Sequence, residues 1–181
     1  PCFFITLLNE QLVIRKKNKN KLIKNFMTIK FLNVYNNLVN LTTNKKLYIS
    51  LRSQDTFSDR LIIFLTHFAF FLKVYKTEEN KKILQEIYDF NFRQMELSIR
   101  EIGYGDQSIN KKMKDYINLF HSMVSEIHFW DDLSKPDKLK KISTFLSDFQ
   151  NNEELLKYFD HFNTNLSKKT LNSYLKSVSN P

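Results

Sequence analysis

Glycine, proline and cysteine are scarce in this chain of 181 residues, which contains two glycines, three prolines and one cysteine. Because β-hairpins, phosphate-binding loops and dinucleotide-binding turns depend on glycine, the composition argues against all three. The single cysteine, Cys2, excludes a disulfide framework and a cysteine-based zinc site, and it fits a reducing, cytoplasmic location. The fold class that remains is all-α, a compact irregular bundle of about seven helices joined by short polar loops.

The net charge of +9 is concentrated at the start of the chain. Residues 1–26 contain six basic residues and one acidic residue, a net charge of +5, so +4 remains for residues 27–181. We therefore expect a basic segment over 1–26, which is a disordered tail or sequence translated upstream of Met27, and one all-helical domain over 27–181. A signal peptide is not expected, because the apolar part precedes the basic run. The alternative for this segment is an anchor on an anionic membrane surface, peripheral at the inner membrane.

The most apolar segment, residues 61–72, is too short to cross a bilayer. A helix of this length spans about 18 Å, whereas the hydrocarbon core is about 30 Å thick. Apolar side chains occur on nearly all sides of the expected helix, which predicts burial at the centre of the bundle. The alternative is that part of the helix is held open for a partner. Asp55 or Ser58 is expected to cap its first turn.

Arg60 and His67 are seven residues apart on this apolar helix and therefore share one side of it. An unpaired charge or imidazole would be costly there, so both side chains need polar partners. A buried network with Asp55, Asp89 or Asp106 is expected, and direct contact with a ligand is the alternative.

Two amphipathic helices joined by a tight turn are predicted between residues 84 and 127. The first has apolar residues at helical spacing: Leu84, Tyr88, Phe92, Met95, Ile99 and Ile102. Its opposite face is polar: Asp89, Arg93, Glu96 and Arg100. The second has a longer apolar face: Ile109, Met113, Tyr116, Ile117, Phe120, Met123, Val124 and Ile127.

Both glycines of the chain, Gly103 and Gly105, lie in the turn between these helices. A glycine directly after a helix can adopt the left-handed conformation that closes the last carbonyls. Asp106 or Ser108 is expected to cap the second helix, and adjacent Arg100 and Glu101 are expected to form a pair that stabilises the turn.

Four further helices are predicted from their apolar spacing, over residues 31–41, 134–149, 155–162 and 171–178. Ser134 and Pro136 resemble an N-cap followed by proline in the first turn.

No catalytic, cofactor-binding or metal site is predicted, so we expect a protein that is not an enzyme. His121 and His128 are seven residues apart and do not have the spacing that lets two histidines bind one metal ion. Asp131 and Asp132 fit a solvated loop beside an anchoring Trp130. Specific DNA binding is not expected, because the charges on each helix after the tail are mixed in sign, although the basic tail could contact ribosomal RNA.

The middle of the chain resembles the ubiquinol-cytochrome c chaperone family. In that family a helix with an acidic residue and a methionine ends in Leu-Arg-Glu, and a Gly-x-Gly-Asp turn and a lysine-rich helix start follow it. The matching residues here are Asp89, Met95, Arg100, Glu101, Gly103, Gly105, Asp106, Lys111 and Lys112. Upstream, Asp55, Arg60 and His67 fit further family positions, so the resemblance covers residues 31–135. Asp59 departs from the pattern, because the family usually has glycine before the arginine.

The resemblance implies a non-enzymatic assembly chaperone for respiratory complex III of alphaproteobacteria and mitochondria. The implied client is newly made cytochrome b or another complex III subunit, and the implied partners are a small protein, the ribosome and the inner membrane. The matched residues are expected to be structural or to bind the client. A groove over Phe68, Phe71 or Phe92 would favour this interpretation. The alternative is a basic adaptor at the membrane surface or ribosome that does not select a client.

Overall fold

The computed structural model describes residues 19–48, 56–147 and 149–176, and these residues form seven α-helices, two short 3-10 helices and no β-sheet. In chain order they are α2 (Lys19–Leu41), η1 (Lys45–Tyr48), α3 (Phe57–Tyr75), α4 (Lys81–Glu101), α5 (Asp106–His128), η2 (Trp130–Asp132), α6 (Lys135–Phe145), α7 (Asn152–Ser167) and α8 (Leu171–Lys176). The predicted all-α class is confirmed.

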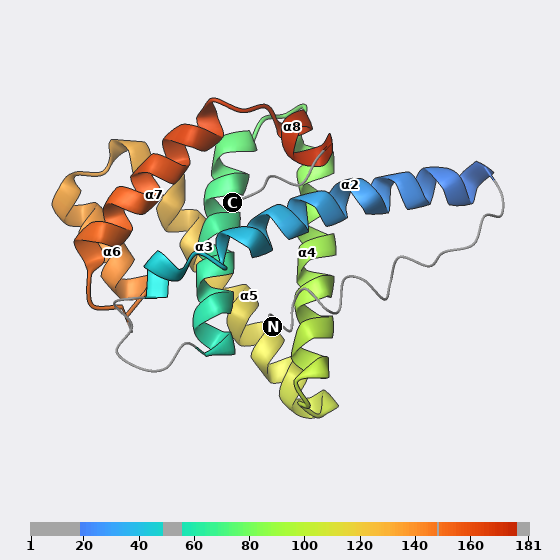
Figure 1. Ribbon diagram of the computed structural model, residues 1–181, viewed down its shortest axis with the longest axis horizontal. Helices are drawn as coiled ribbons and strands as arrows, with labels where there is room; N and C mark the ends of the chain where they lie inside the picture. Colours follow the sequence, from blue (N-terminus) through green and yellow to red (C-terminus); the bar gives the residue numbers. More distant parts are fainter. Residues whose placement is uncertain (1–18, 49–55, 148, 177–181) are drawn as a thin grey trace.

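The apolar helix α3 lies at the centre of the bundle, where it contacts α2, α5 and α7 (Figure 1). Phe68, Phe70 and Phe71 on different sides of α3 are all fully buried. Burial of one such side chain contributes about 1.5–3 kcal/mol. The prediction of central burial is therefore confirmed. A groove over Phe68, Phe71 or Phe92 would have favoured the chaperone interpretation, but all three side chains are buried in the core.

Thr56 caps α3 through a capping box. Its hydroxyl accepts a hydrogen bond from the amide of Asp59 at 3.2 Å, and the Asp59 carboxylate accepts one from the amide of Thr56 at 2.9 Å. Ser58 lies inside the helix, so the expected cap at Ser58 is wrong, and Asp55 lies outside the described residues. The acidic residue at position 59 thus has a local role, since it satisfies a backbone donor that a glycine side chain could not.

The turn between α4 and α5 contains the left-handed glycine that was predicted, but the residues predicted to cap α5 do not cap it. Gly103 has φ of +95°, and its amide donates to the carbonyl of Arg100 at 3.0 Å, which closes the end of α4. Gly105, with φ of −72°, is the N-cap of α5 and makes no side-chain cap. Asp106 is already in the first turn, so the expected cap by Asp106 or Ser108 is wrong. Ile102 was expected to point inward but is 40% exposed, because α4 ends before it.

Helix α2 crosses the bundle and contacts α3, α4 and α8 (Figure 1). Two asparagines of α2 bind the carbonyls of α8: Asn33 Nδ2 donates to Leu175 O at 3.1 Å and Asn37 Nδ2 to Tyr174 O at 3.5 Å. The helix begins at Lys19, so residues 19–26 are helical although disorder was expected for them. Residues 1–18 lie outside the described part, and the division of the chain at residue 26 stays a prediction.

Helices α6 and α7 pack on each other, and α7 also packs on the central helix. Ser134 is the N-cap of α6 and accepts a hydrogen bond from the amide of Asp137, with proline in the first turn, as predicted. The apolar residues expected to face inward from α7 are all buried: Leu155, Leu156, Phe159 and Phe162.

Candidate functional site

A surface groove with a volume of about 480 Å³ opens where the end of α3, the start of α4 and the end of α5 meet. Its apolar lining comprises Leu72, Leu84, Tyr88, Val124 and Phe129. Phe129 follows α5 directly and is 58% exposed, the highest value among the large apolar side chains that the structure describes. Pockets for ligands have volumes of about 300–1,000 Å³, so the groove is large enough to accept apolar side chains of another molecule.

The rim of this groove carries more positive than negative charge. Lys73, Lys76 and Lys81 line it, against the single carboxylate of Glu78. Lys76 and Lys81 are exposed, and neither has an ion-pair partner within the described ranges. The groove therefore combines an apolar lining with two cations available to a bound molecule.

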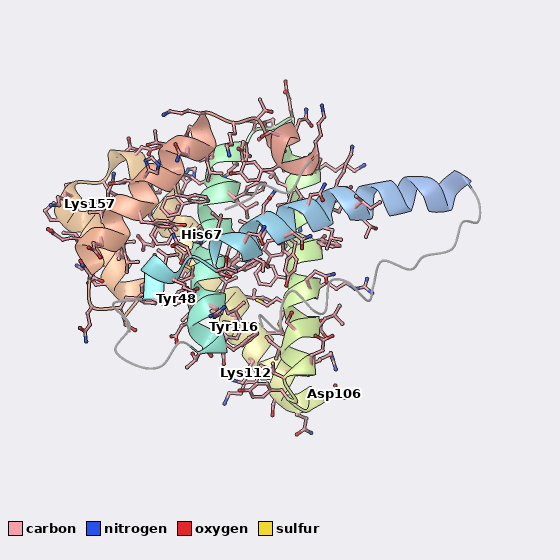
Figure 2. The ribbon with its side chains drawn as sticks, viewed as in Figure 1. Tyr48, His67, Asp106, Lys112, Tyr116 and Lys157 are labelled. Carbon is pink, nitrogen blue, oxygen red and sulfur yellow. The ribbon has the colours of Figure 1, made fainter. Side chains whose placement is uncertain are left out.

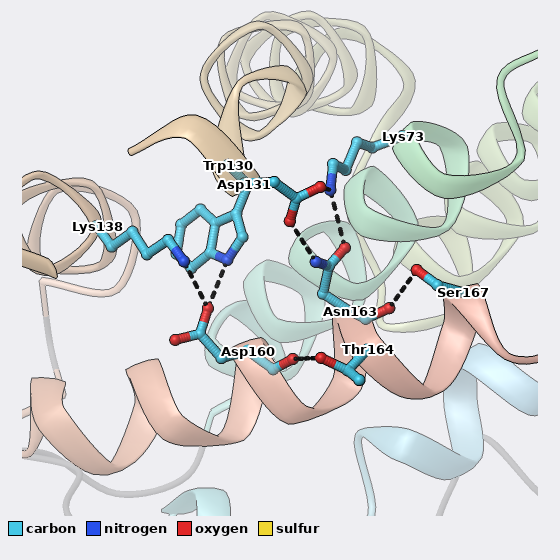
Figure 3. A network of polar contacts seen from close by, with 8 residues as sticks. All are labelled: Lys73, Trp130, Asp131, Lys138, Asp160, Asn163, Thr164 and Ser167. Atoms are coloured by element: carbon cyan, nitrogen blue, oxygen red, sulfur yellow. Dashed lines mark hydrogen bonds and ion pairs between the residues drawn. The ribbon is translucent and has the colours of Figure 1, made fainter. Parts of the chain in front are cut away.

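A polar network holds Lys73 at the rim (Figure 3). Its ammonium group pairs with the carboxylate of Asp131 and donates to Oδ1 of Asn163 at 3.1 Å. Asn163 in turn donates to Asp131 Oδ1 at 2.8 Å. Burial alone would raise the pKa of Asp131, but the hydrogen bond and the charge of Lys73 hold that pKa below its ordinary value. Asp131 and Asp132 are exposed, as expected for a solvated loop, and Asp131 is in addition part of a network that joins α3 to α7.

Trp130 anchors the same network to the core. Its ring is 1% exposed and packs edge-on against Phe70, with ring centroids 5.0 Å apart. Its indole nitrogen donates to Asp160 Oδ1 at 2.8 Å, and Lys138 pairs with the same carboxylate at 3.1 Å (Figure 3). The prediction that Trp130 is an anchoring aromatic residue is confirmed.

Several family-motif residues gather at the turn between α4 and α5, at the end of the bundle where Figure 2 labels Asp106 and Lys112. Arg100 pairs with Glu96 at 2.8 Å and with Asp106 across the turn. The expected pairing of Arg100 with Glu101 is therefore wrong. The ammonium group of Lys112 lies 4.5 Å from the ring centroid of Tyr104. These contacts brace the turn, and they involve exposed side chains.

Arg60 and Met95 meet at a small cavity between α2, α3 and α4. The cavity has a volume of about 10 Å³ and is also lined by Tyr35 and Leu61, so it has room for about one water molecule. The guanidinium carbon of Arg60 lies 5.4 Å from the ring centroid of Tyr48. Of the expected partners of Arg60, Asp89 and Asp106 are bound elsewhere, and Asp55 lies outside the described residues.

His67, which Figure 2 labels on α3, is completely buried. Its polar partners differ from those expected. Nδ1 lies 2.7 Å from the carbonyl oxygen of Ile63, and Nε2 lies 2.7 Å from the hydroxyl of Tyr158. A carbonyl can only accept, so Nδ1 carries the proton and Nε2 accepts the proton of Tyr158. Burial lowers the pKa of His67 to about 4, even though the bond to Ile63 acts in the opposite direction. The expected carboxylate partners are therefore wrong, and the imidazole is a neutral part of the core.

The remaining motif residues are separate from these groups. Asp89 is exposed on α4 and accepts a hydrogen bond from Gln85 at 2.9 Å, and Lys111 is exposed in the first turns of α5. None of the motif residues that the structure describes lines the groove. The signal in the sequence that could have indicated the groove is the apolar residue Phe129 directly beyond a helix end.

The last features of the site are a histidine beside the groove and the lack of metal-binding clusters and membrane spans among the described residues. His121 Nε2 lies 3.1 Å from the hydroxyl of Tyr88. Within residues 19–48, 56–147 and 149–176, no cluster of three metal-binding side chains is found, and no helix combines the length and apolar character of a membrane span.

Comparison with known families bears directly on the part of the chain that forms the groove. Residues 50–128 match a family model described as ubiquinol-cytochrome C chaperone. No curated protein and no solved structure matches the chain. The match is shorter than the predicted range 31–135, and it contains every residue that lines the groove except Phe129. Residues 50–128 are thus similar to the ubiquinol-cytochrome C chaperone family, in agreement with the predicted resemblance.

Proposed function

We propose that this protein is a non-enzymatic assembly chaperone for ubiquinol-cytochrome c reductase, respiratory complex III. The observation that carries the proposal is the match of residues 50–128 to the chaperone family. The proposed client is newly made cytochrome b or a related membrane-protein segment.

The geometry suits binding by burial of apolar surface. A groove with apolar walls can hold a helix of a client whose own partners are not yet in place, because the exposed apolar face of that client would otherwise contact water. The lining of α3, α4 and α5 supplies such walls, with lysines at the edge. Such binding requires no chemical step on the client.

We further propose that the protein acts at the inner-membrane surface where cytochrome b is inserted. A small partner protein, the ribosome and anionic lipid are the proposed contacts, and clustered lysines gain about 1 kcal/mol per charge near an anionic bilayer. The motif residues Asp55, Arg60, His67, Asp89, Met95, Arg100, Glu101, Gly103, Gly105, Asp106, Lys111 and Lys112 are proposed to shape the fold on which this binding depends.

Deletion of the gene and immunoprecipitation of the protein during synthesis of its client test the proposal. We expect cytochrome b to be recovered with the protein and complex III to decrease in the deletion strain. Unchanged complex III levels would exclude the chaperone function. A chain that lacks residues 1–26 should still recover cytochrome b, whereas an adaptor that acts through its basic tail would lose its location.

A further inference from the structure

We propose that the groove between α3, α4 and α5 is a docking site for an amphipathic helical segment of a partner protein, with an apolar face flanked by carboxylates. This inference deepens the proposed chaperone function and rests on it, because it specifies the class of segment that the protein would hold.

The apolar part of the argument starts from Phe129. A phenylalanine that is 58% exposed at the mouth of a groove leaves apolar surface in water next to the half-buried Leu72 and Val124. An amphipathic helix inserts side chains at positions i, i+3 and i+4 into such a groove and covers this surface. A phosphate backbone would leave these side chains uncovered, so a protein segment fits better than RNA.

The charges at the rim of the groove indicate which charge the residues beside the apolar face of the partner helix should carry. Lys76 and Lys81 are exposed and have no ion-pair partner within the described ranges, whereas Lys73 is held in place by Asp131. Helix α4 begins at the groove with no acidic residue in its first turn, so its N-terminus adds positive potential to that of Lys76 and Lys81, against the one carboxylate of Glu78 at the rim. Carboxylates beside the apolar face of a partner would gain from this potential, and lysines there would be repelled.

Binding of two synthetic peptides to the purified full chain tests the proposal. One peptide is an amphipathic helix with a leucine face flanked by glutamates, and the other has lysines in place of the glutamates. We expect the wild type to prefer the glutamate peptide, and the double variant Lys76→Glu with Lys81→Glu to lose about tenfold in affinity for it and to prefer the lysine peptide. A purely structural role of these lysines would not reverse the preference.

Matched variants control for effects on folding. Phe129→Ser should weaken binding of the glutamate peptide about tenfold, whereas Ile29→Ser, at a side chain that is 52% exposed on α2, should not. Lys140→Glu with Lys157→Glu, two exposed lysines on α6 and α7, should keep the preference of the wild type. Equal binding of both peptides by the wild type, or unchanged binding by the Phe129 and lysine variants, would overturn the proposal.

Expression of the groove variants in the deletion strain separates this inference from the proposed function. If deletion lowers complex III and the groove variants restore it fully, the groove is not the docking site and the chaperone function stands. If deletion leaves complex III unchanged but the wild type prefers the glutamate peptide and the lysine double variant prefers the lysine peptide, the groove is a docking site and the chaperone function is excluded.

Discussion

Acidification should destabilise this protein through His67, a histidine that the fold keeps neutral. In the unfolded chain the imidazole takes up a proton near its ordinary pKa of about 6.5. In the folded chain burial lowers that pKa to about 4. Between these two values the unfolded state binds more protons than the folded state, so stability is lost as the pH falls from about 6.5 to 4.

The size of this effect follows from the difference between the two pKa values. One pKa unit corresponds to about 1.36 kcal/mol, so the loss from His67 reaches about 3 kcal/mol at pH 4. Against a total stability of about 5–15 kcal/mol for a typical domain, this is a large fraction. Below the pKa of the folded state the contribution of His67 becomes constant, because both states are then protonated.

Denaturant unfolding of the full chain from pH 4 to 8 measures the effect, with His67→Gln as the comparison. Glutamine offers one donor and one acceptor without titrating, so the wild type should lose about 3 kcal/mol more than the variant between pH 7 and 4. Carboxylates titrate in both proteins and cancel in the difference. Identical pH dependence of the two proteins, or an imidazole that titrates near pH 6.5 by NMR in the folded wild type, would refute the burial of a neutral His67.

Three further changes test local features of the fold. Tyr158→Phe removes the hydroxyl that donates to the buried imidazole, so the free energy of unfolding, measured by denaturant titration, should fall by about 1–3 kcal/mol. An unchanged midpoint would show that this hydrogen bond is absent. Gly103→Ala should lower the free energy of unfolding by about 1–2 kcal/mol, because φ at this position is +95°. Gly105→Ala should be close to neutral, because φ is −72° and nothing lies within 4 Å of the added methyl group. Equal thermal shifts for the two variants would contradict the conformation of the turn. Thr56→Ala should cost about 0.5–2 kcal/mol through loss of the cap, and Ser58→Ala much less; the reverse order would move the cap to Ser58.

Helical periodicity predicted most of the inward faces, because it is a local property of the chain. The apolar stripe of α4 is buried at Leu84, Phe92, Met95 and Ile99, whereas Tyr88 is half-buried and Ile102 is exposed because the helix ends before it. Local hydrogen-bonding rules likewise predicted the left-handed glycine after α4 and the Ser134 cap of α6.

The polar partners of the central helix were missed, because they lie on a helix that is far from it in the sequence. Tyr158 is 91 residues from His67, and Asn163 is 90 residues from Lys73, so spacing along one helix carries no information about either pair. Asp89 and Asp106 had suitable chemistry, but they are bound to Gln85 and Arg100 instead. The groove was missed for the same reason, since three helix ends form it together.

Composition, helical periodicity and motifs predicted an all-helical chain with a central apolar helix, a glycine turn and the family that residues 50–128 match. These features depend on composition, on a period of about 3.6 residues and on the conformational freedom of one glycine, all of which are local. Packing of the helices, in contrast, makes His67 neutral and pairs Lys73 with Asp131, whereas it leaves Lys76 and Lys81 exposed at the groove. These properties could not be predicted locally, because burial and charge pairing depend on which helices approach one another.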